Sequence, residues 1–123
     1  MANVIVVDDA KVMRLSIIRQ LEKLGHSVVS EASNGYEAVE EYKKHKSDFV
    51  TMDISMPNVN GITNGIDALV KIKEFDTSAN VIMVTSHGEE KLVIDAISKG
   101  SKGYILKPIT QDKLSSILKK ISF

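Results

Sequence analysis

Four short apolar runs, separated by segments of helical character, constrain the fold of this chain more than any other feature. The runs are rich in Val and Ile, and such runs with helices between them are typical of strands buried in a parallel sheet. In an open parallel sheet, ligands and chemistry gather where the strands end. The runs are 4–7, 49–52, 81–84 and 104–106, and the residues that follow them are Asp8-Asp9, Asp53, Thr85 and Lys107-Pro108.

The segments between and after these runs predict five helices. In the first helix, Met13, Ile17 and Leu21 share one apolar face. A fifth, more polar strand is expected at residues 27–32, at an edge of the sheet. The alternation predicts an α/β fold in one domain, residues 1–123, with five parallel strands and helices on both faces of the sheet. The other helices are expected at about 36–45, 66–75, 89–99 and 114–121.

The composition is that of a single soluble domain without a nucleic-acid or membrane partner. The 123 residues include 16 basic and 16 acidic side chains, so no strong field of either sign is expected. The chain has no cysteine, which excludes disulfides and thiolate metal sites and suits the reducing cytoplasm. No secretion signal and no apolar run long enough to cross a bilayer is present. We therefore expect a cytoplasmic protein.

Three carboxylates at the ends of two predicted strands indicate a cation site. Asp8 and Asp9 follow the first run, and Asp53 follows the second. Two unit charges about 4 Å apart repel by about 4 kcal/mol at an effective dielectric constant of 20. A fold that brings these carboxylates together therefore needs a cation beside them.

Each of these polar residues also has an ordinary structural interpretation. An Asp at a strand end is often a helix N-cap or a turn former, and Thr85 could begin a helix. Lys107 could be a solvated lysine before an edge proline. Taken one at a time, these interpretations are the better ones. Taken together they weaken, because the predicted fold places the residues on adjoining loops.

The order and spacing of these residues resemble the receiver domain of two-component response regulators, of the single-domain, CheY-like chemotaxis type. The resemblance extends from Asn3 to the end of the chain. It implies a doubly wound, flavodoxin-like sheet with strand order 2-1-3-4-5. The motifs that carry it are Asp8-Asp9, Asp53 with Met56-Pro57, Thr85-Ser86 and Lys107-Pro108.

The resemblance implies that Asp53 is the phosphoacceptor, which takes a phosphoryl group from a phosphohistidine of a CheA-like sensor histidine kinase. It also implies that Asp9, Asp53 and the backbone carbonyl of Ser55 hold Mg²⁺ or Mn²⁺, with Asp8 bound through water. Lys107 offsets the negative charge of the transferring phosphoryl group, and a cis bond to Pro108 directs its ammonium into the pocket. The chain is then a switch and not an enzyme.

Two further roles follow from the resemblance. Thr85 donates its hydroxyl to a phosphoryl oxygen and Tyr104 turns inward with it. This movement reshapes the surface of the fourth helix, fifth strand and fifth helix for a target such as a flagellar motor switch or a phosphorelay protein. Ser55 and His87 border the path of the hydrolytic water and modulate dephosphorylation. His26 and His45 are expected to be solvated.

Two features depart from the family pattern. Asn60-Gly61-Ile62-Thr63 is followed by the near repeat Asn64-Gly65-Ile66-Asp67, which indicates a four-residue insertion beside the metal-binding carbonyl. The insertion could add a turn to the third helix or form a loop, and two Asn-Gly pairs favour the loop. The fourth helix begins with Glu89 and Glu90 where well-known chemotaxis members carry lysines.

Other functions remain open at this point. A receiver outside chemotaxis, or one that works without phosphorylation, has the same fold. A Mg²⁺-dependent phosphatase with an Asp nucleophile needs a second Asp two residues later, where Asp53 has Ser55. A flavin-binding electron carrier needs a phosphate-binding loop after the first strand, where Asp8 and Asp9 would repel a phosphate.

Overall fold

The computed structural model describes residues 1–121 and contains five strands that alternate with five helices. All five predicted strands are present, and the helix bounds lie within a few residues of those predicted. The strands are β1 (Asn3–Val7), β2 (Ser27–Ala32), β3 (Phe49–Met52), β4 (Val81–Thr85) and β5 (Gly103–Leu106). The helices are α1 (Lys11–Lys23), α2 (Gly35–His45), α3 (Gly65–Phe75), α4 (Glu90–Ser98) and α5 (Gln111–Lys119).

The strands form one parallel sheet with the order β2-β1-β3-β4-β5, as the family resemblance implied. The pairing register sets which strand ends are neighbours. Val7 of β1 lies opposite Met52 of β3, so the residues that follow them, Asp8 and Asp53, leave the sheet side by side. At the other side of β4, Thr85 pairs with Leu106 of β5, immediately before Lys107.

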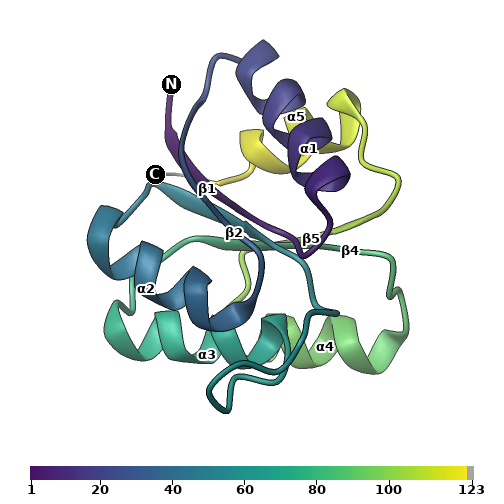
Figure 1. The fold of residues 1–123 in the computed structure, drawn as a ribbon. Coiled ribbons are helices and arrows are strands. Elements are labelled where there is room, and N and C mark those ends of the chain that lie inside the picture. Colours follow the sequence, from purple (N-terminus) through teal and green to yellow (C-terminus); the bar gives the residue numbers. More distant parts are fainter. Residues whose placement is uncertain (122–123) are drawn as a thin grey trace.

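Helices cover both faces of the sheet, with α1 and α5 on one face and α2, α3 and α4 on the other (Figure 1). Alternate residues of a strand point to opposite faces, so each central strand contributes to two cores. One core contains Val4, Val6, Ile17, Phe49 and Leu114, and the second contains Ile5, Val7, Val50, Leu69 and Ile72. Strands buried on both sides explain why the sequence shows continuous apolar runs and not an alternating pattern.

The helices α2 and α3 begin with the same local motif. Asn34 and Asn64 are the N-cap residues, and each side-chain oxygen accepts a hydrogen bond from the backbone of a residue three positions later. The residues at those positions are Glu37 and Asp67. Their carboxylates accept hydrogen bonds from the backbone N–H and the hydroxyl of the Ser or Thr that comes before each N-cap. These bonds form a variant of the capping box, in which the acidic side chain accepts from the residue before the N-cap and not from the N-cap itself. Asn34, in an Asn-Gly pair like Asn64, is thus a helix cap.

The predicted insertion forms a short hairpin in front of α3 and adds no turn to that helix. Val59 and Ile62 exchange two backbone hydrogen bonds of 3.2 and 3.1 Å. Asn60 and Gly61, between them, have φ of 52° and 82°, which is the conformation that Asn-Gly adopts in a type I′ turn. Ile62 is buried, and its Cγ2 atom lies 2.6 Å from the position that a Cβ at Gly35 would occupy. The hairpin is therefore packed onto the start of α2.

Within residues 1–121, no helix is both long enough and apolar enough to cross a bilayer.

Candidate functional site

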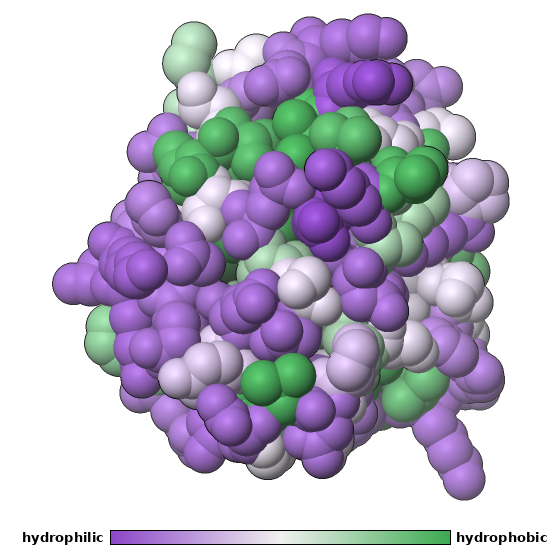
Figure 2. Space-filling model, in the orientation of Figure 1, coloured by the Kyte–Doolittle hydropathy of each residue, from purple (hydrophilic) through white to green (hydrophobic). Residues whose placement is uncertain are grey.

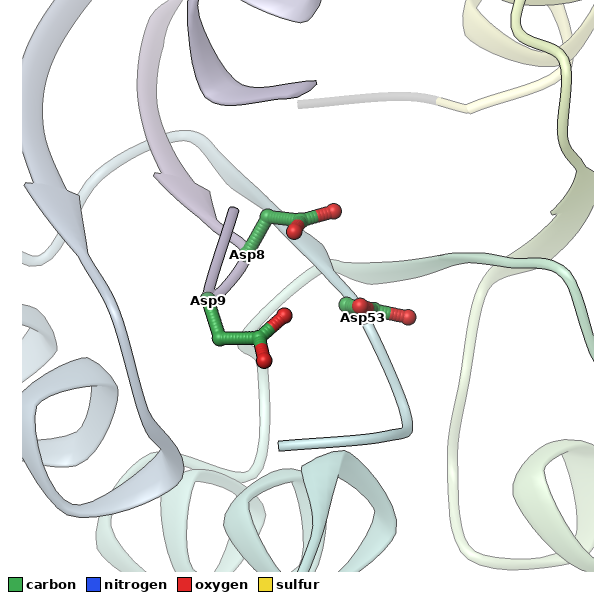
Figure 3. Close-up of side chains that lie close together, drawn as sticks. All are labelled: Asp8, Asp9 and Asp53. Carbon is green, nitrogen blue, oxygen red and sulfur yellow. The ribbon is translucent and has the colours of Figure 1, made fainter. Parts of the chain in front are cut away.

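Three carboxylates from two loops meet at the C-terminal edge of the sheet. Asp8 and Asp9 lie in the loop after β1, and Asp53 directly follows β3. One oxygen from each lies within 4.8 Å of the other two, and Figure 3 shows the three side chains next to one another. Asp8 and Asp53 are only 1% and 5% exposed, whereas Asp9 faces solvent. Three carboxylates this close, two of them buried, could hold a divalent cation with oxygen ligands.

Backbone N–H groups set the orientation of the two buried carboxylates. Asp8 Oδ1 accepts a bond of 2.9 Å from the backbone of Ala10, and Asp53 Oδ1 accepts one of 2.8 Å from Ile54. The second oxygen of each carboxylate faces Lys107. Each carboxylate is thus held by its own loop on one side and by a cation on the other.

Lys107 is the cation that the structure places in this cluster. Its ammonium lies 2.7 Å from Asp8 Oδ2 and 3.4 Å from Asp53 Oδ2, and its side chain is 17% exposed. The peptide bond between Lys107 and Pro108 is cis. The cluster has three carboxylates and one ammonium, which pairs with two of them, so the cluster keeps a net negative charge.

The pKa values of the cluster reflect this imbalance. Burial, followed by the charge of Asp8, raises the pKa of Asp53 above its ordinary value, and Lys107 opposes this only in part. Burial alone would lower the pKa of Lys107, but its bonds and charge interactions with Asp8 and Asp53 outweigh burial and raise it. Lys107 is therefore charged at neutral pH, and a further cation would relieve the remaining repulsion.

His87 connects the remaining predicted residues across the mouth of the cluster. Its backbone N–H donates to Thr85 Oγ1 at 3.2 Å, and its carbonyl accepts a bond from the Tyr104 hydroxyl at 2.5 Å. Its ring Nε2 lies 2.6 Å from Ser55 Oγ, and Nδ1 lies 3.8 Å from a Glu89 carboxylate oxygen. Thr85 is fully buried, whereas the His87 ring is 39% exposed. The loop after β4 therefore contacts the loop after β3 and strand β5 through one residue.

Two residues of the site were missed by sequence reasoning. The guanidinium of Arg14 donates to the backbone carbonyl of Asp8 at 2.7 Å and to Glu31 at 2.9 Å, which ties the acidic loop to α1 and β2. Gly65 donates its N–H to Ile54 at 2.8 Å, and a Cβ at Gly65 would lie 1.9 Å from the Asp53 carbonyl oxygen. The second Asn-Gly pair therefore allows α3 to begin against the backbone of Asp53.

The hairpin region forms one wall of the acidic cleft. The open pocket beside Asp9 is lined by Ser55 and Met56 on one side and by Thr63 and Asn64 on the other. Thr63 and Asn64 directly follow the Val59–Ile62 hairpin. The predicted insertion thus lies at the cleft, and access to the carboxylates passes beside it.

Two partly apolar surfaces lie near this edge of the molecule. Val12 and Leu15 on α1 are 78% and 40% exposed, and Figure 2 shows an apolar band at the level where α1 lies in Figure 1. A groove along β5 and α5 is lined by Tyr104, Leu106 and Ile117. Both are surfaces on which another protein could dock.

The other two histidines lie outside the site. His45 is exposed, as predicted. The expectation of a solvated side chain was wrong for His26. Its Nδ1 accepts a bond of 3.1 Å from Ala2, its ring packs edge-on against Phe49, and burial lowers its pKa.

Comparison with known proteins gives one consistent result. Residues 4–119 match the response regulator receiver domain family. Chemotaxis protein CheY of Bacillus subtilis is 46% identical over 118 residues, which cover 96% of this chain and 95% of that protein. CheY of Thermotoga maritima is 43% identical over 120 residues, or 98% and 97% of the two chains. The crystal structure of a CheX-CheY-BeF3-Mg²⁺ complex from Borrelia burgdorferi contains a similar chain, with a TM-score of 0.88, 37% identity, and coverage of 94% of this chain and 85% of that one.

Proposed function

Because the chain belongs to the response regulator receiver domain family, we propose that it is a phosphorylation-controlled switch of chemotaxis two-component signalling, acting in the cytoplasm as a single domain over residues 1–123. The observation that carries the proposal is the cluster of three carboxylates and one ammonium at the strand ends. A receiver needs a carboxylate nucleophile there and positive charge to oppose the incoming phosphoryl group.

The carboxylates fit Mg²⁺, or Mn²⁺ in its place. Asp9, Asp53 and the backbone carbonyl of Ser55 would hold the ion, with Asp8 bound through water. All of these donors are oxygen atoms, and a site with few protein ligands suits an ion that keeps several waters. When bound, the ion neutralises charge on the phosphoryl oxygens. The Mg²⁺ in the related Borrelia structure is consistent with this choice.

Asp53 is the proposed phosphoacceptor. Its Oδ2 attacks the phosphorus of a phosphohistidine, the new O–P bond gives an acyl phosphate, and the N–P bond breaks so that the imidazole leaves with the bonding electrons. The bond from Ile54 holds the other oxygen and fixes the carboxylate plane. Lys107, 3.4 Å from Oδ2, is placed to bind a phosphoryl oxygen after the transfer.

Thr85 and Tyr104 are the proposed switch residues. The Thr85 hydroxyl accepts a bond from His87, and the Tyr104 hydroxyl donates to the carbonyl of that same residue. When Thr85 turns to a phosphoryl oxygen, the loop that carries His87 must adjust, and Tyr104 adjusts with it. The groove along β5 and α5 contains Tyr104, so the output reaches the α4-β5-α5 surface.

Ser55 and His87 are the proposed modulators of dephosphorylation, because their side chains meet over the mouth of the cleft. The chain promotes its own phosphorylation and dephosphorylation and turns over no separate substrate. Its proposed partners are a CheA-like histidine kinase and a downstream protein, either a flagellar motor switch component or a phosphorelay protein. Glu89 and Glu90 at the start of α4 favour a target surface with complementary basic groups.

The proposal is tested by intact-mass measurement after incubation with Mg²⁺ and a small-molecule phosphodonor. The parent should gain one phosphoryl group and Asp53→Asn should gain none. The control Asp95→Asn, at a half-exposed residue of α4 that pairs with Lys99, should behave like the parent. An adduct of equal yield on Asp53→Asn would contradict the assignment. Repeated hydrolysis of a phosphomonoester would instead indicate the phosphatase.

A further inference from the structure

The three Asn-Gly pairs of this chain offer the same chemistry in different surroundings. They are Asn34-Gly35, Asn60-Gly61 and Asn64-Gly65. Glycine has no side chain to hinder its backbone nitrogen, so that nitrogen can attack the side-chain carbonyl carbon of the preceding Asn. The attack requires the Asn side chain and the Gly N–H to be free of other bonds, and it requires the backbone to rotate.

Two of the three pairs are held by hydrogen bonds and packing. Asn34 Oδ1 accepts a bond of 2.8 Å at the start of α2, and Asn64 Oδ1 accepts one of 2.9 Å at the start of α3. Gly35 and Gly65 are buried, and the Gly65 nitrogen already donates to Ile54. Rotating either Asn into the reactive geometry would break a helix cap and disturb the packing around its glycine.

The third pair is exposed at the tip of the Val59–Ile62 hairpin. Asn60 and Gly61 both face solvent, and a Cβ at Gly61 would contact nothing. Among residues 1–121, no hydrogen bond to the Asn60 side chain or from the Gly61 nitrogen is found. Local opening of this tip disturbs only two backbone bonds, whereas opening the other pairs disturbs a helix start.

We propose that Asn60 is a site of spontaneous deamidation in the folded protein. The Gly61 nitrogen loses its proton and forms a bond to Cγ of Asn60, and the bond from Cγ to Nδ2 breaks, which releases ammonia. Water then opens the cyclic imide at one of its two carbonyls and gives aspartate or isoaspartate. No oxidant, reductant or enzyme is required.

Deamidation places a new negative charge on the hairpin that leads into one wall of the acidic cleft. The hairpin leads directly into Thr63 and Asn64, which line the pocket beside Asp9. A carboxylate at residue 60 adds to the negative field there, and salt screens the effect because the group is exposed. Isoaspartate also lengthens the backbone of the tight turn. Older molecules would thus carry this added charge beside the proposed metal site more often than newly made ones.

The test is incubation of the native protein at mildly alkaline pH, followed by peptide mass spectrometry with fragment-ion assignment of each Asn. We expect Asn60 to be converted at least about tenfold faster than Asn34 or Asn64, because local opening of an exposed tip is far cheaper than opening a helix start. In denaturing urea the three rates should converge, since the local sequences are alike. Asn60→Ser should retain the fold and lose the fast conversion.

Two results would overturn the proposal. One is a native protein in which Asn34 or Asn64 is converted as fast as Asn60. The other is a native Asn60 that is no faster than the slowest site while the urea-unfolded chain reacts at all three, because the hairpin then protects its tip. Neither result depends on phosphoryl transfer or metal binding.

Discussion

The side chains of Ser55 and His87 meet across the mouth of the acidic cleft, with Oγ of the serine 2.6 Å from Nε2 of the histidine. The bond joins the loop after β3, which carries the proposed phosphoacceptor, to the loop after β4. Ser55 is exposed and also lines the pocket beside Asp9, so the bond lies on the solvent side of the buried carboxylates. A phosphoryl group on Asp53 would sit behind it.

We predict that Ser55→Ala accelerates loss of the phosphoryl group. The substitution removes the bond that holds the His87 ring over the cleft, so water reaches the acyl phosphate more easily. The decay of phosphorylated protein, followed by mass or radiolabel, should be several-fold faster than in the parent. Ser98→Ala, an exposed serine on α4, is the matched control. An unchanged or slower decay would show that the bond does not restrict water.

Lys107→Ala should destabilise the fold in the absence of Mg²⁺. The change leaves Asp8 and Asp53 buried without their cation, and breaking a buried ion pair typically costs about 3–5 kcal/mol. The free energy of unfolding, measured with urea, should fall by an amount near the lower end of this range, because the ammonium is partly exposed. Saturating Mg²⁺ should recover much of it. Equal losses with and without Mg²⁺, or a similar loss for the exposed Lys102→Ala, would contradict this electrostatic account.

Asp53→Asn should stabilise the metal-free protein at neutral pH. The raised pKa of Asp53 means that the folded state holds this proton more tightly than the unfolded state. The free energy of unfolding therefore falls as pH rises from the unfolded-state pKa, about 4, through the raised folded-state pKa. The Asn variant avoids that loss, and its advantage should vanish below the unfolded-state pKa. Urea midpoints of parent and variant, measured across this pH range, check both the direction of the stability change and the pH interval over which it occurs. A variant less stable than the parent at neutral pH would refute the prediction.

Gly65→Ala should displace the backbone of the proposed phosphoacceptor. The added Cβ would lie 1.9 Å from the Asp53 carbonyl oxygen, so helix α3 or the end of β3 must move. We expect a loss of about 1–3 kcal/mol in the free energy of unfolding, together with weaker phosphorylation. Gly61→Asn meets open space but a strained positive φ, so it should cost some stability and leave phosphorylation close to that of the parent. Parent-like phosphorylation of Gly65→Ala would show that the site tolerates the shift.

Arg14→Ala should weaken Mg²⁺ binding although the residue is not a proposed ligand. Arg14 holds the Asp8 carbonyl from outside, and loss of such a supporting bond typically costs about tenfold or more in metal affinity. Removal of positive charge alone would act in the opposite direction and tighten binding. Titration with Mg²⁺ or Mn²⁺ thus separates positioning from charge by the sign of the change. Arg19→Ala, on the same helix, supplies the control.

The fold was largely predictable because strands buried on both faces have a plain sequence signature. Run 81–84 is apolar throughout and run 49–52 is apolar except for Thr51, and both are fully buried in the central strands. Periodicity alone does not give the order of the strands, which came from the family resemblance. The start of α3 was predicted to within one residue, but the role of Asn64-Gly65 was not, because an Asn-Gly pair is compatible with either a turn or a helix cap. The Asp67 that completes the capping box was the available signal.

The residues of the candidate site were also predictable only in part. Asp8, Asp9, Asp53 and Lys107 could be placed together from sequence because parallel strand ends share one edge of the sheet. Arg14 could not, because its role depends on where the first turn of α1 meets a backbone carbonyl. The link through His87 was equally hidden, since two of its bonds use main-chain atoms that any residue possesses.

The hairpin in front of α3 also gives the protein an attachment point. Ile62 anchors its base beside Gly35, while Asn60 at the tip faces solvent. Since the natural chain contains no cysteine, Asn60→Cys would create a unique thiol there. A fluorophore coupled to that thiol would sit close to the cleft wall and could report ion or phosphoryl occupancy in real time.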